Sequence, residues 1–153
     1  MEQKTKIEAQ NGRQDLLITR EFELPLHLLF KAYVVPEIVA QWMNTKVQKL
    51  ESRKHGSYSF ETTDPMGNKH GFNGVIHEFV ENQKITRTFE MENTAFPVWI
   101  EYLEFEKLTD KTSKLTMHVV HKSPDVRDQI LKLPFAQGIN WAHNRLEELL
   151  KQG

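Results

Sequence analysis

The alternation of apolar and polar positions over residues 15 to 23 indicates a β-strand. Leu16, Ile18 and Phe22 fall on one face together with Arg20, while the opposite face ends in charged residues. A period of two with one strongly apolar face is typical of a strand that is buried on one side. Residues 4 to 9 are a candidate edge strand before it, and Asn11-Gly12 is a plausible turn between the two.

Two prolines in the stretch from residue 22 to residue 42 predict two very short helices in succession. Pro25 suits the first helical position, where its missing N–H group costs nothing. Pro36 ends this helix, because the residue before a proline is pushed out of the α region, and it starts the next one. Isolated helices this short are not stable, so burial must hold both of them. The inward positions at helical spacing are Leu26, Leu29, Phe30, Tyr33, Val34, Ile38, Val39, Trp42 and Met43.

From residue 45 to residue 121 the pattern is one of strands separated by turn signals. Each connection is short, polar and rich in Gly, Asn, Asp or Pro, as antiparallel hairpins require. The pattern predicts a meander of six strands, and the strand at residues 15 to 23 could join its edge. The predicted strands are residues 45–52, 56–63, 69–80, 84–92, 98–108 and 113–121.

The C-terminal part predicts a helical region with one interruption. Ser123 can cap a helix with Pro124 in its first turn, and Pro134 interrupts or kinks that helix. Residues 135–151 then form a helix roughly 25 Å long with one apolar face. That face must be buried on the concave side of the sheet, which predicts an α+β fold of about six to seven antiparallel strands wrapped on the helix. The two short helices would close one end and leave a pocket inside.

Several motifs follow one another along the chain in a recognisable order. They are Ile18-Thr19-Arg20-Glu21-Phe22, Pro25, Phe30-Lys31-Ala32, Pro36-Glu37, Gln41-Trp42, Arg53, Gly56, Tyr58-Ser59-Phe60, Asp64 to Gly67, Phe72-Asn73-Gly74, His77-Glu78, Thr88-Phe89-Glu90, Gly138, Leu146 and Leu149-Leu150. This order resembles the family of activators of the 90-kDa heat-shock-protein ATPase (AHSA-like), within the START-like (SRPBCC) helix-grip superfamily. The resemblance implies a single helix-grip domain over residues 14–151, with residues 1–13 as an N-terminal extension.

The resemblance also frames three hypotheses about function. Members of the superfamily bind lipids, hormones or polyketides, so the first hypothesis is a protein that holds a small apolar or amphipathic molecule in its cavity. The second is an interaction protein that binds a heat-shock chaperone or another protein through an exterior face, with a role in the stress response. The third is an enzyme of the cyclase or hydrolase type that uses the same cavity. No cofactor is predicted.

Composition and charge exclude several classes of binding partner and of chemistry. The 153 residues suit one domain, and the net charge of −1, with basic and acidic residues interspersed, predicts no interaction with nucleic acid. The absence of cysteine excludes disulfides, thiol catalysis and thiolate zinc sites. A polar N-terminus and the lack of an apolar run of roughly 20 residues predict no membrane span and a cytoplasmic location. Either a monomer or a homodimer is compatible with these features.

Aromatic and apolar residues are the candidates for the wall of the predicted pocket. For each residue alone a packed core is the simpler interpretation, but together in this topology they favour an apolar cavity with few polar groups. The candidates are Trp42, Phe60, Phe72, Phe89, Trp99, Phe135 and Ile139.

Arg20 is a further candidate, because it shares an apolar face with Ile18 and Phe22. A lone cation there is costly unless it is paired or reaches water. The favoured interpretation pairs it with a carboxylate such as Glu90 or Glu104, or places it at the sheet edge. The alternative is that it faces an anionic ligand head group.

The seven histidines have no metal-binding spacing, so no metal site is predicted. His118 and His121 lie three residues apart in a strand and must face opposite sides. His118, or one of His77 and Glu78, could supply acid–base chemistry inside the pocket, so His118 is retained as a site candidate. His143 follows Ala142 on the long helix, and the surface is its expected place, with the pocket margin as the alternative. No residue is predicted to be catalytic, because no nucleophile or phosphate-binding motif is present.

Overall fold

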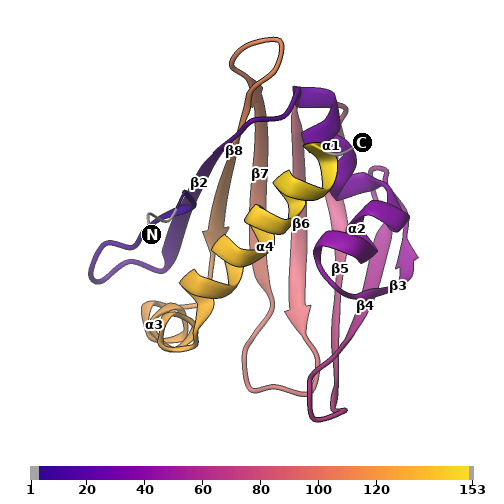
Figure 1. Ribbon diagram of the computed structural model, residues 1–153. Coiled ribbons are helices and arrows are strands. Elements are labelled where there is room, and N and C mark those ends of the chain that lie inside the picture. Colours follow the sequence, from indigo (N-terminus) through magenta and orange to yellow (C-terminus); the bar gives the residue numbers. More distant parts are fainter. Residues whose placement is uncertain (1–3, 152–153) are drawn as a thin grey trace.

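An antiparallel sheet of eight strands runs through the protein, seen in a computed structural model that describes residues 4–151 (Figure 1). Its spatial order is β1-β2-β8-β7-β6-β5-β4-β3, so successive hairpins build it from β3 to β8 and β2 lies beside β8. The strands are β1 (Lys6–Glu8), β2 (Asp15–Phe22), β3 (Lys46–Leu50), β4 (Ser57–Thr63), β5 (Lys69–Val80), β6 (Lys84–Met91), β7 (Trp99–Lys107) and β8 (Ser113–Val120).

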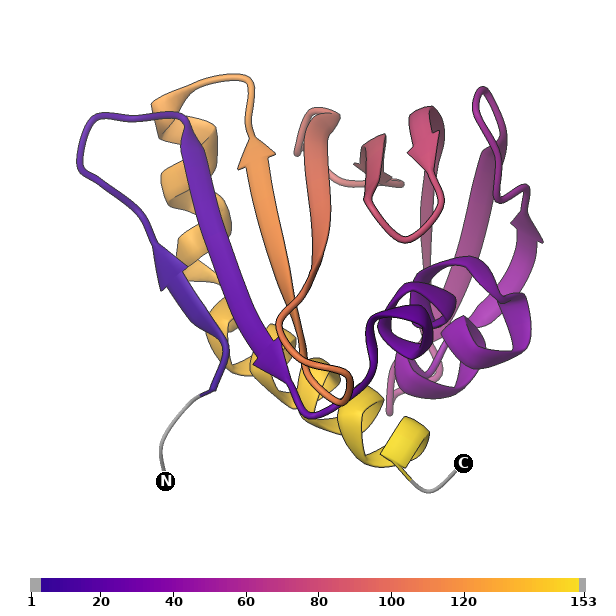
Figure 2. The ribbon, with the colours of Figure 1, turned by 90° about the horizontal axis from the view of Figure 1, so that it is seen from above.

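Four helices accompany the sheet within the described residues, and the longest of them crosses its concave side (Figures 1 and 2). They are α1 (Leu26–Val34), α2 (Pro36–Trp42), α3 (Pro124–Lys132) and α4 (Phe135–Lys151). This arrangement confirms the predicted α+β helix-grip fold. The sheet has one strand more than the upper expectation, because residues 6–8 pair with β2 through Lys6 opposite Thr19 and Ile7 opposite Ile18.

Two irregularities in the strand pairing coincide with the bent half of the sheet. The register shifts between Val47 and Lys49 where β3 pairs with β4, and between Ile76 and Glu78 where β5 pairs with β6. Such bulges bend a strand and increase its local twist. Figure 2 shows the result, with the β2 and β3 sides of the sheet turned toward the side on which α4, α1 and α2 lie.

The prolines mark the helix boundaries, with one correction. Pro25 precedes α1 as its N-cap instead of being its first helical residue, and its carbonyl oxygen accepts hydrogen bonds from the Leu28 and Leu29 N–H groups at 3.0 and 3.1 Å. Ser123 caps α3 as predicted, because its Oγ accepts from the Val126 N–H at 3.2 Å. Pro134 separates α3 from α4 and thereby confirms the predicted interruption.

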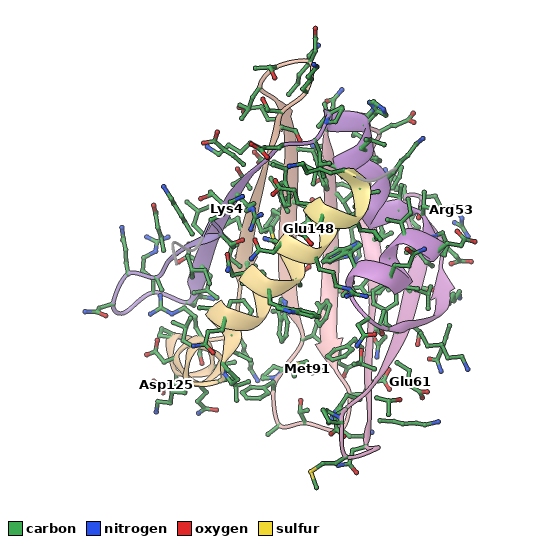
Figure 3. The ribbon with its side chains drawn as sticks, viewed as in Figure 1. Lys4, Arg53, Glu61, Met91, Asp125 and Glu148 are labelled. Atoms are coloured by element: carbon green, nitrogen blue, oxygen red, sulfur yellow. The ribbon has the colours of Figure 1, made fainter. Side chains whose placement is uncertain are left out.

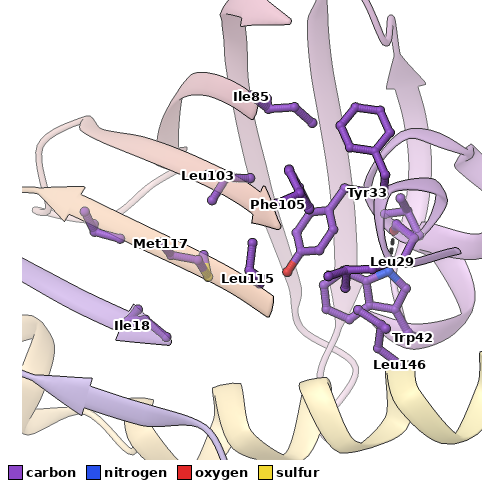
Figure 4. Packing of buried hydrophobic residues seen from close by; sticks show 14 of the residues in the cluster. Ile18, Leu29, Tyr33, Trp42, Ile85, Leu103, Phe105, Leu115, Met117 and Leu146 are labelled. Carbon is purple, nitrogen blue, oxygen red and sulfur yellow. Dashed lines mark hydrogen bonds between the residues drawn. The ribbon is translucent and has the colours of Figure 1, made fainter. Parts of the chain in front are cut away.

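The two short helices are held by burial of their apolar sides, as their length requires. The Phe30 ring of α1 packs edge-on against Phe105 of β7, with ring centroids 5.0 Å apart. Tyr33 contacts both Phe105 and Trp42, at 5.5 and 5.2 Å between centroids (Figure 4). The Trp42 Nε1–H donates to the Ala32 carbonyl at 2.6 Å, which fixes α2 on α1. The pair therefore closes one end of the concave side, as predicted.

Candidate functional site

A cavity of about 560 Å³ lies between the concave face of the sheet, α4 and the end of α2. Aromatic rings and the side chains of Met43 and Met117 form much of its wall. Gly138 and the α3–α4 junction also belong to the wall and are exposed, so the cavity reaches solvent at the start of α4. Met91 of β6 is a further wall residue, and Figure 3 shows it at this same end of the molecule.

Six of the nine predicted site residues come together in this wall. They are Trp42, Phe72, Phe89, Trp99, Phe135 and Ile139. The rings of Phe89 and Trp99, which are opposite each other on β6 and β7, stack at 5.0 Å between centroids. Phe72 of β5 continues this row at 5.6 Å from Phe89. Alternation along each strand therefore places these rings on the concave face as the sequence predicts.

Phe60 does not line the cavity. It is 1% exposed and belongs to the core, where its ring lies 5.1 Å from that of Tyr58. Its inward orientation was predictable from strand alternation, but strand β4 lies toward the sheet edge that α2 covers. The prediction that Phe60 forms part of the wall is therefore wrong.

Arg20 pairs with a carboxylate, as the favoured interpretation holds, but the partner comes from α4. Its Nη2 lies 3.4 Å from Glu147 Oε1, and its Nη1 donates to Asn144 Oδ1 at 2.7 Å and to Thr5 Oγ1 at 3.2 Å. Glu90 and Glu104 are not its partners. Arg20 is absent from the cavity wall, so its charge fastens β2 to α4 and does not face a ligand there.

His118 lies outside the cavity and is a second correction. Its side chain is 44% exposed, its Nε2 is 2.8 Å from Asp15 Oδ2, and its ring stacks on Tyr102 at 5.9 Å. These contacts lie on the outer face of β2, β7 and β8, since Leu16, Leu103 and Met117 occupy the buried face. Hydrogen bonds from Arg13 and His118 hold the pKa of Asp15 well below its usual range.

An ion pair between β6 and β7 is the main feature of the wall that the sequence analysis missed. Arg87 and Glu101 are opposite each other, and Arg87 Nε donates to Glu101 Oε1 at 2.9 Å. Trp99 Nε1 donates to the other oxygen, Glu101 Oε2, at 3.0 Å. Arg87 and Glu101 are 7% and 6% exposed. Alternation with Phe89 and with Trp99 was the available signal, because it places both charges on the concave face.

Aromatic rings surround the Arg87 guanidinium. Its central carbon lies 5.2 Å from the ring centroid of Tyr58 and 5.9 Å from that of Tyr33. Burial favours the neutral guanidine, but the Glu101 carboxylate and these rings outweigh that effect and raise the pKa of Arg87. Gly74 leaves room for this arrangement, since a Cβ at that position would overlap the Tyr58 hydroxyl and the Thr88 carbonyl oxygen.

His143, expected at the surface, is 1% exposed and lines the cavity. Its Nδ1 lies 2.9 Å from Thr5 Oγ1, and its ring meets Phe22 edge-on at 5.5 Å. Burial, reinforced by the charge of Arg20, lowers its pKa to about 3. The ring is therefore neutral near pH 7. The surface prediction failed because Thr5, Phe22 of β2 and Trp42 of α2 lie against the side of α4 that carries His143.

His121 is the other buried histidine, 2% exposed, and neither of its ring nitrogens has a hydrogen-bond partner among the described residues. It lines a small inner space of about 50 Å³ that shares Trp99, Glu101 and Ile139 with the main cavity. Burial lowers its pKa, so it too is neutral near pH 7. As predicted, His118 and His121 lie on opposite sides of the sheet. Within residues 4–151, no three metal-binding side chains gather into a metal site.

The fold and the cavity together define a helix-grip domain, a curved sheet that encloses a pocket beneath a long helix. The sequence profile of one such family, described as Activator of Hsp90 ATPase homolog 1-like protein, matches residues 23–151. The chain belongs to this family. None of the helices in the described part of the chain has the length and apolar character that crossing a membrane requires.

Solved structures show the same fold in bacterial proteins. Protein Ms6760 of Mycobacterium smegmatis superposes with a TM-score of 0.85 at 22% identity, covering 95% of this chain and 96% of that one. A Rhodobacter sphaeroides protein gives 0.88 at 17% identity, covering 98% and 99%. A Nitrosomonas europaea protein gives 0.79 at 24%, covering 91% and 95%. No curated protein matches the chain.

Proposed function

We propose that this protein binds a small apolar or amphipathic molecule in the cavity beneath α4. The carrying observation is the cavity itself, about 560 Å³ in volume and walled chiefly by aromatic and other apolar side chains. Its size lies within the roughly 300–1,000 Å³ typical of small-molecule sites, and its few polar groups match the usual make-up of such sites.

Burial of the ligand's apolar surface supplies the binding energy. Each aliphatic group the size of a leucine side chain contributes roughly 1.5–3 kcal/mol when it leaves water completely. The methionines in the wall, Met43, Met91 and Met117, have unbranched side chains that adapt to different shapes. The cavity therefore suits a family of related apolar molecules better than one rigid shape.

The polar groups of the wall favour binding over catalysis. Both oxygens of Glu101 already accept hydrogen bonds, from Arg87 and from Trp99. His143 stays neutral because its pKa is lowered to about 3, which makes it a weak proton acceptor near pH 7. Neither group is arranged as a general base, so the hypothesis of a cyclase or hydrolase gains no support from this geometry.

The description of the family favours a second candidate function, contact with a heat-shock chaperone. An exterior face would make this contact, and it is compatible with a ligand inside. The chaperone of the same organism provides the test: its ATPase rate should change at saturating amounts of this protein. An unchanged rate would refute this second candidate and leave the ligand-binding proposal untouched.

Native mass spectrometry of the purified protein, together with its melting temperature in the presence of diphenylmethane, tests ligand binding. Ala142 lines the cavity, whereas Ala136 of the same helix is exposed and lies outside the wall. We expect Ala142→Phe to abolish both a co-purified mass and the rise in melting temperature, because the new ring occupies the cavity. Ala136→Phe is the matched control and should keep both. If Ala142→Phe does not fold, Ala142→Leu replaces it. Wild-type protein that shows neither effect would refute the proposal.

A further inference from the structure

Among the described residues, the Arg87 guanidinium donates to the protein through its Nε alone, which leaves the four N–H groups on Nη1 and Nη2. Its Nε is bound to Glu101, and the rings of Tyr58 and Tyr33 lie near it. Its Nη1 and Nη2 make no hydrogen bond to any residue between 4 and 151, although the side chain is more than nine-tenths buried and lines the cavity. Neither atom is among the fully buried side-chain atoms without a partner, so both nitrogens remain accessible from the cavity and can donate to a molecule inside it.

A second donor lies close by. Tyr33 lines the same cavity, and its hydroxyl forms no hydrogen bond within the described part of the chain. Figure 4 shows this hydroxyl on the far side of the ring from the α1 backbone. Burial raises the pKa of Tyr33, so the hydroxyl keeps its proton and remains able to donate.

The charge at this point of the wall is already balanced. Glu101 lies 2.9 Å from Arg87, so the pair carries no net charge. His143, the other titratable group of the wall near Tyr33 and Trp42, is neutral near pH 7 because its pKa is lowered to about 3. An anionic ligand would bring an uncompensated charge into a cavity with a mainly apolar wall, which is costly. A neutral oxygen accepts the same hydrogen bonds without that cost.

We propose that Arg87, assisted by Tyr33, donates hydrogen bonds to a neutral carbonyl oxygen of the bound molecule. Arg87 is then the residue that orients the ligand, and the ligand class narrows to apolar ketones, esters or amides. This inference rests on the proposed binding function and adds a polar preference to it.

Three probes of similar shape test the inference: benzophenone, diphenylmethane and diphenylacetate. They share two phenyl rings and differ in carrying a carbonyl, no acceptor or a carboxylate. Isothermal titration calorimetry at pH 7 should show benzophenone binding at least about tenfold more tightly than diphenylmethane, since hydrogen bonds to charged donors are strong enough for that ratio. The hydrophobic effect alone favours the hydrocarbon, so this order can only come from a polar contact. Diphenylacetate should bind more weakly than benzophenone.

The outcomes separate the inference from the function on which it rests. Equal binding of benzophenone and diphenylmethane, or tighter binding of diphenylacetate than of benzophenone, would overturn the role of Arg87 and leave the apolar cavity standing. If none of the three probes binds, the proposed function fails as well.

A double variant tests whether Arg87 causes the preference for benzophenone over diphenylmethane. In Arg87→Met/Glu101→Gln, both charges are removed together, so no buried charge is left unpaired, and the new amide oxygen still accepts from Trp99 Nε1. We expect this variant to lose the preference for benzophenone over diphenylmethane, measured as the ratio of the two affinities in the same variant. A preference that persists in the folded double variant would contradict the inference. If the double variant does not fold, Tyr33→Phe replaces it and should reduce the ratio of benzophenone affinity to diphenylmethane affinity.

Discussion

A few buried polar residues determine the charge and the hydrogen-bonding groups at the cavity wall. Arg87 and Glu101 neutralise each other inside the wall, while Arg20 and Glu147 do so between β2 and α4. Thr5, from the segment before β1, links Arg20 to His143 through one hydroxyl group. The N-terminal residues therefore support the wall of the site, a role that nothing in their polar sequence indicated.

His143 makes the stability of the fold depend on pH. Its pKa is about 3 in the folded protein, against an ordinary value of 6.5. Because the unfolded chain binds a proton at higher pH than the folded chain does, stability is fully present above pH 6.5 and is lost as the pH falls below it. We expect His143 to contribute a slope approaching about 1.4 kcal/mol per pH unit to the fall of the free energy of unfolding, measured by urea titrations between pH 7 and pH 5.

The variant His143→Gln should flatten that slope, although the buried His121, whose pKa is also lowered, leaves part of it. His27→Gln, at an exposed position of α1, is the control and should keep the wild-type slope. A slope that His143→Gln leaves unchanged would show that the ring is not held neutral by burial.

At the scale of elements, α4 is both the lid of the cavity and the place where its opening lies. Gly138 sits in this helix, its N–H donates to the Pro134 carbonyl at 3.2 Å, and no atom lies within 4 Å of a Cβ built on it. Glycine in a helix costs roughly 0.5–1 kcal/mol relative to alanine. The glycine therefore contributes open space at the cavity rim and makes the helix less stable than it could be.

We expect Gly138→Ala to raise the free energy of unfolding by roughly 0.5–1 kcal/mol, measured in urea, because alanine favours the helix and its methyl group meets nothing. Gly74→Ala is the opposite case. Its methyl group would overlap backbone at Thr88 and the Tyr58 ring, so this variant should be less stable than wild type. A destabilised Gly138→Ala protein would mean that the start of α4 is packed more tightly than described.

At the scale of the whole molecule, the sequence predicted the fold well because periodicity and prolines are local signals. The pattern identified the helix boundaries at Pro36, Ser123 and Pro134 and the meander from β3 to β8. Six wall residues followed from strand and helix faces. What remained hidden depends on contacts between distant segments.

His143, Arg20 and Glu147 illustrate this limit. Whether His143 and Glu147 of α4 are buried depends on Thr5 and on Arg20 of β2 lying beside them, and no local pattern encodes that proximity. Phe60 and His118 show the converse error. Each occupies a strand that was correctly predicted. Phe60 lies outside the cavity because its strand, β4, is near the edge of the sheet, and His118 lies outside it because its side chain is on the outer face.

The methyl groups of the methionines report most directly on the central claim that the cavity beneath α4 binds a small apolar molecule. Met43, Met91 and Met117 line the cavity, whereas Met66 is 87% exposed on a turn and serves as the internal control. The measurement is a methyl NMR titration of protein labelled with ¹³C at methionine, using diphenylmethane as the probe. We predict that the signals of Met43, Met91 and Met117 shift together and saturate while that of Met66 stays in place. Three unmoved cavity signals, at probe concentrations up to its solubility, would contradict the account.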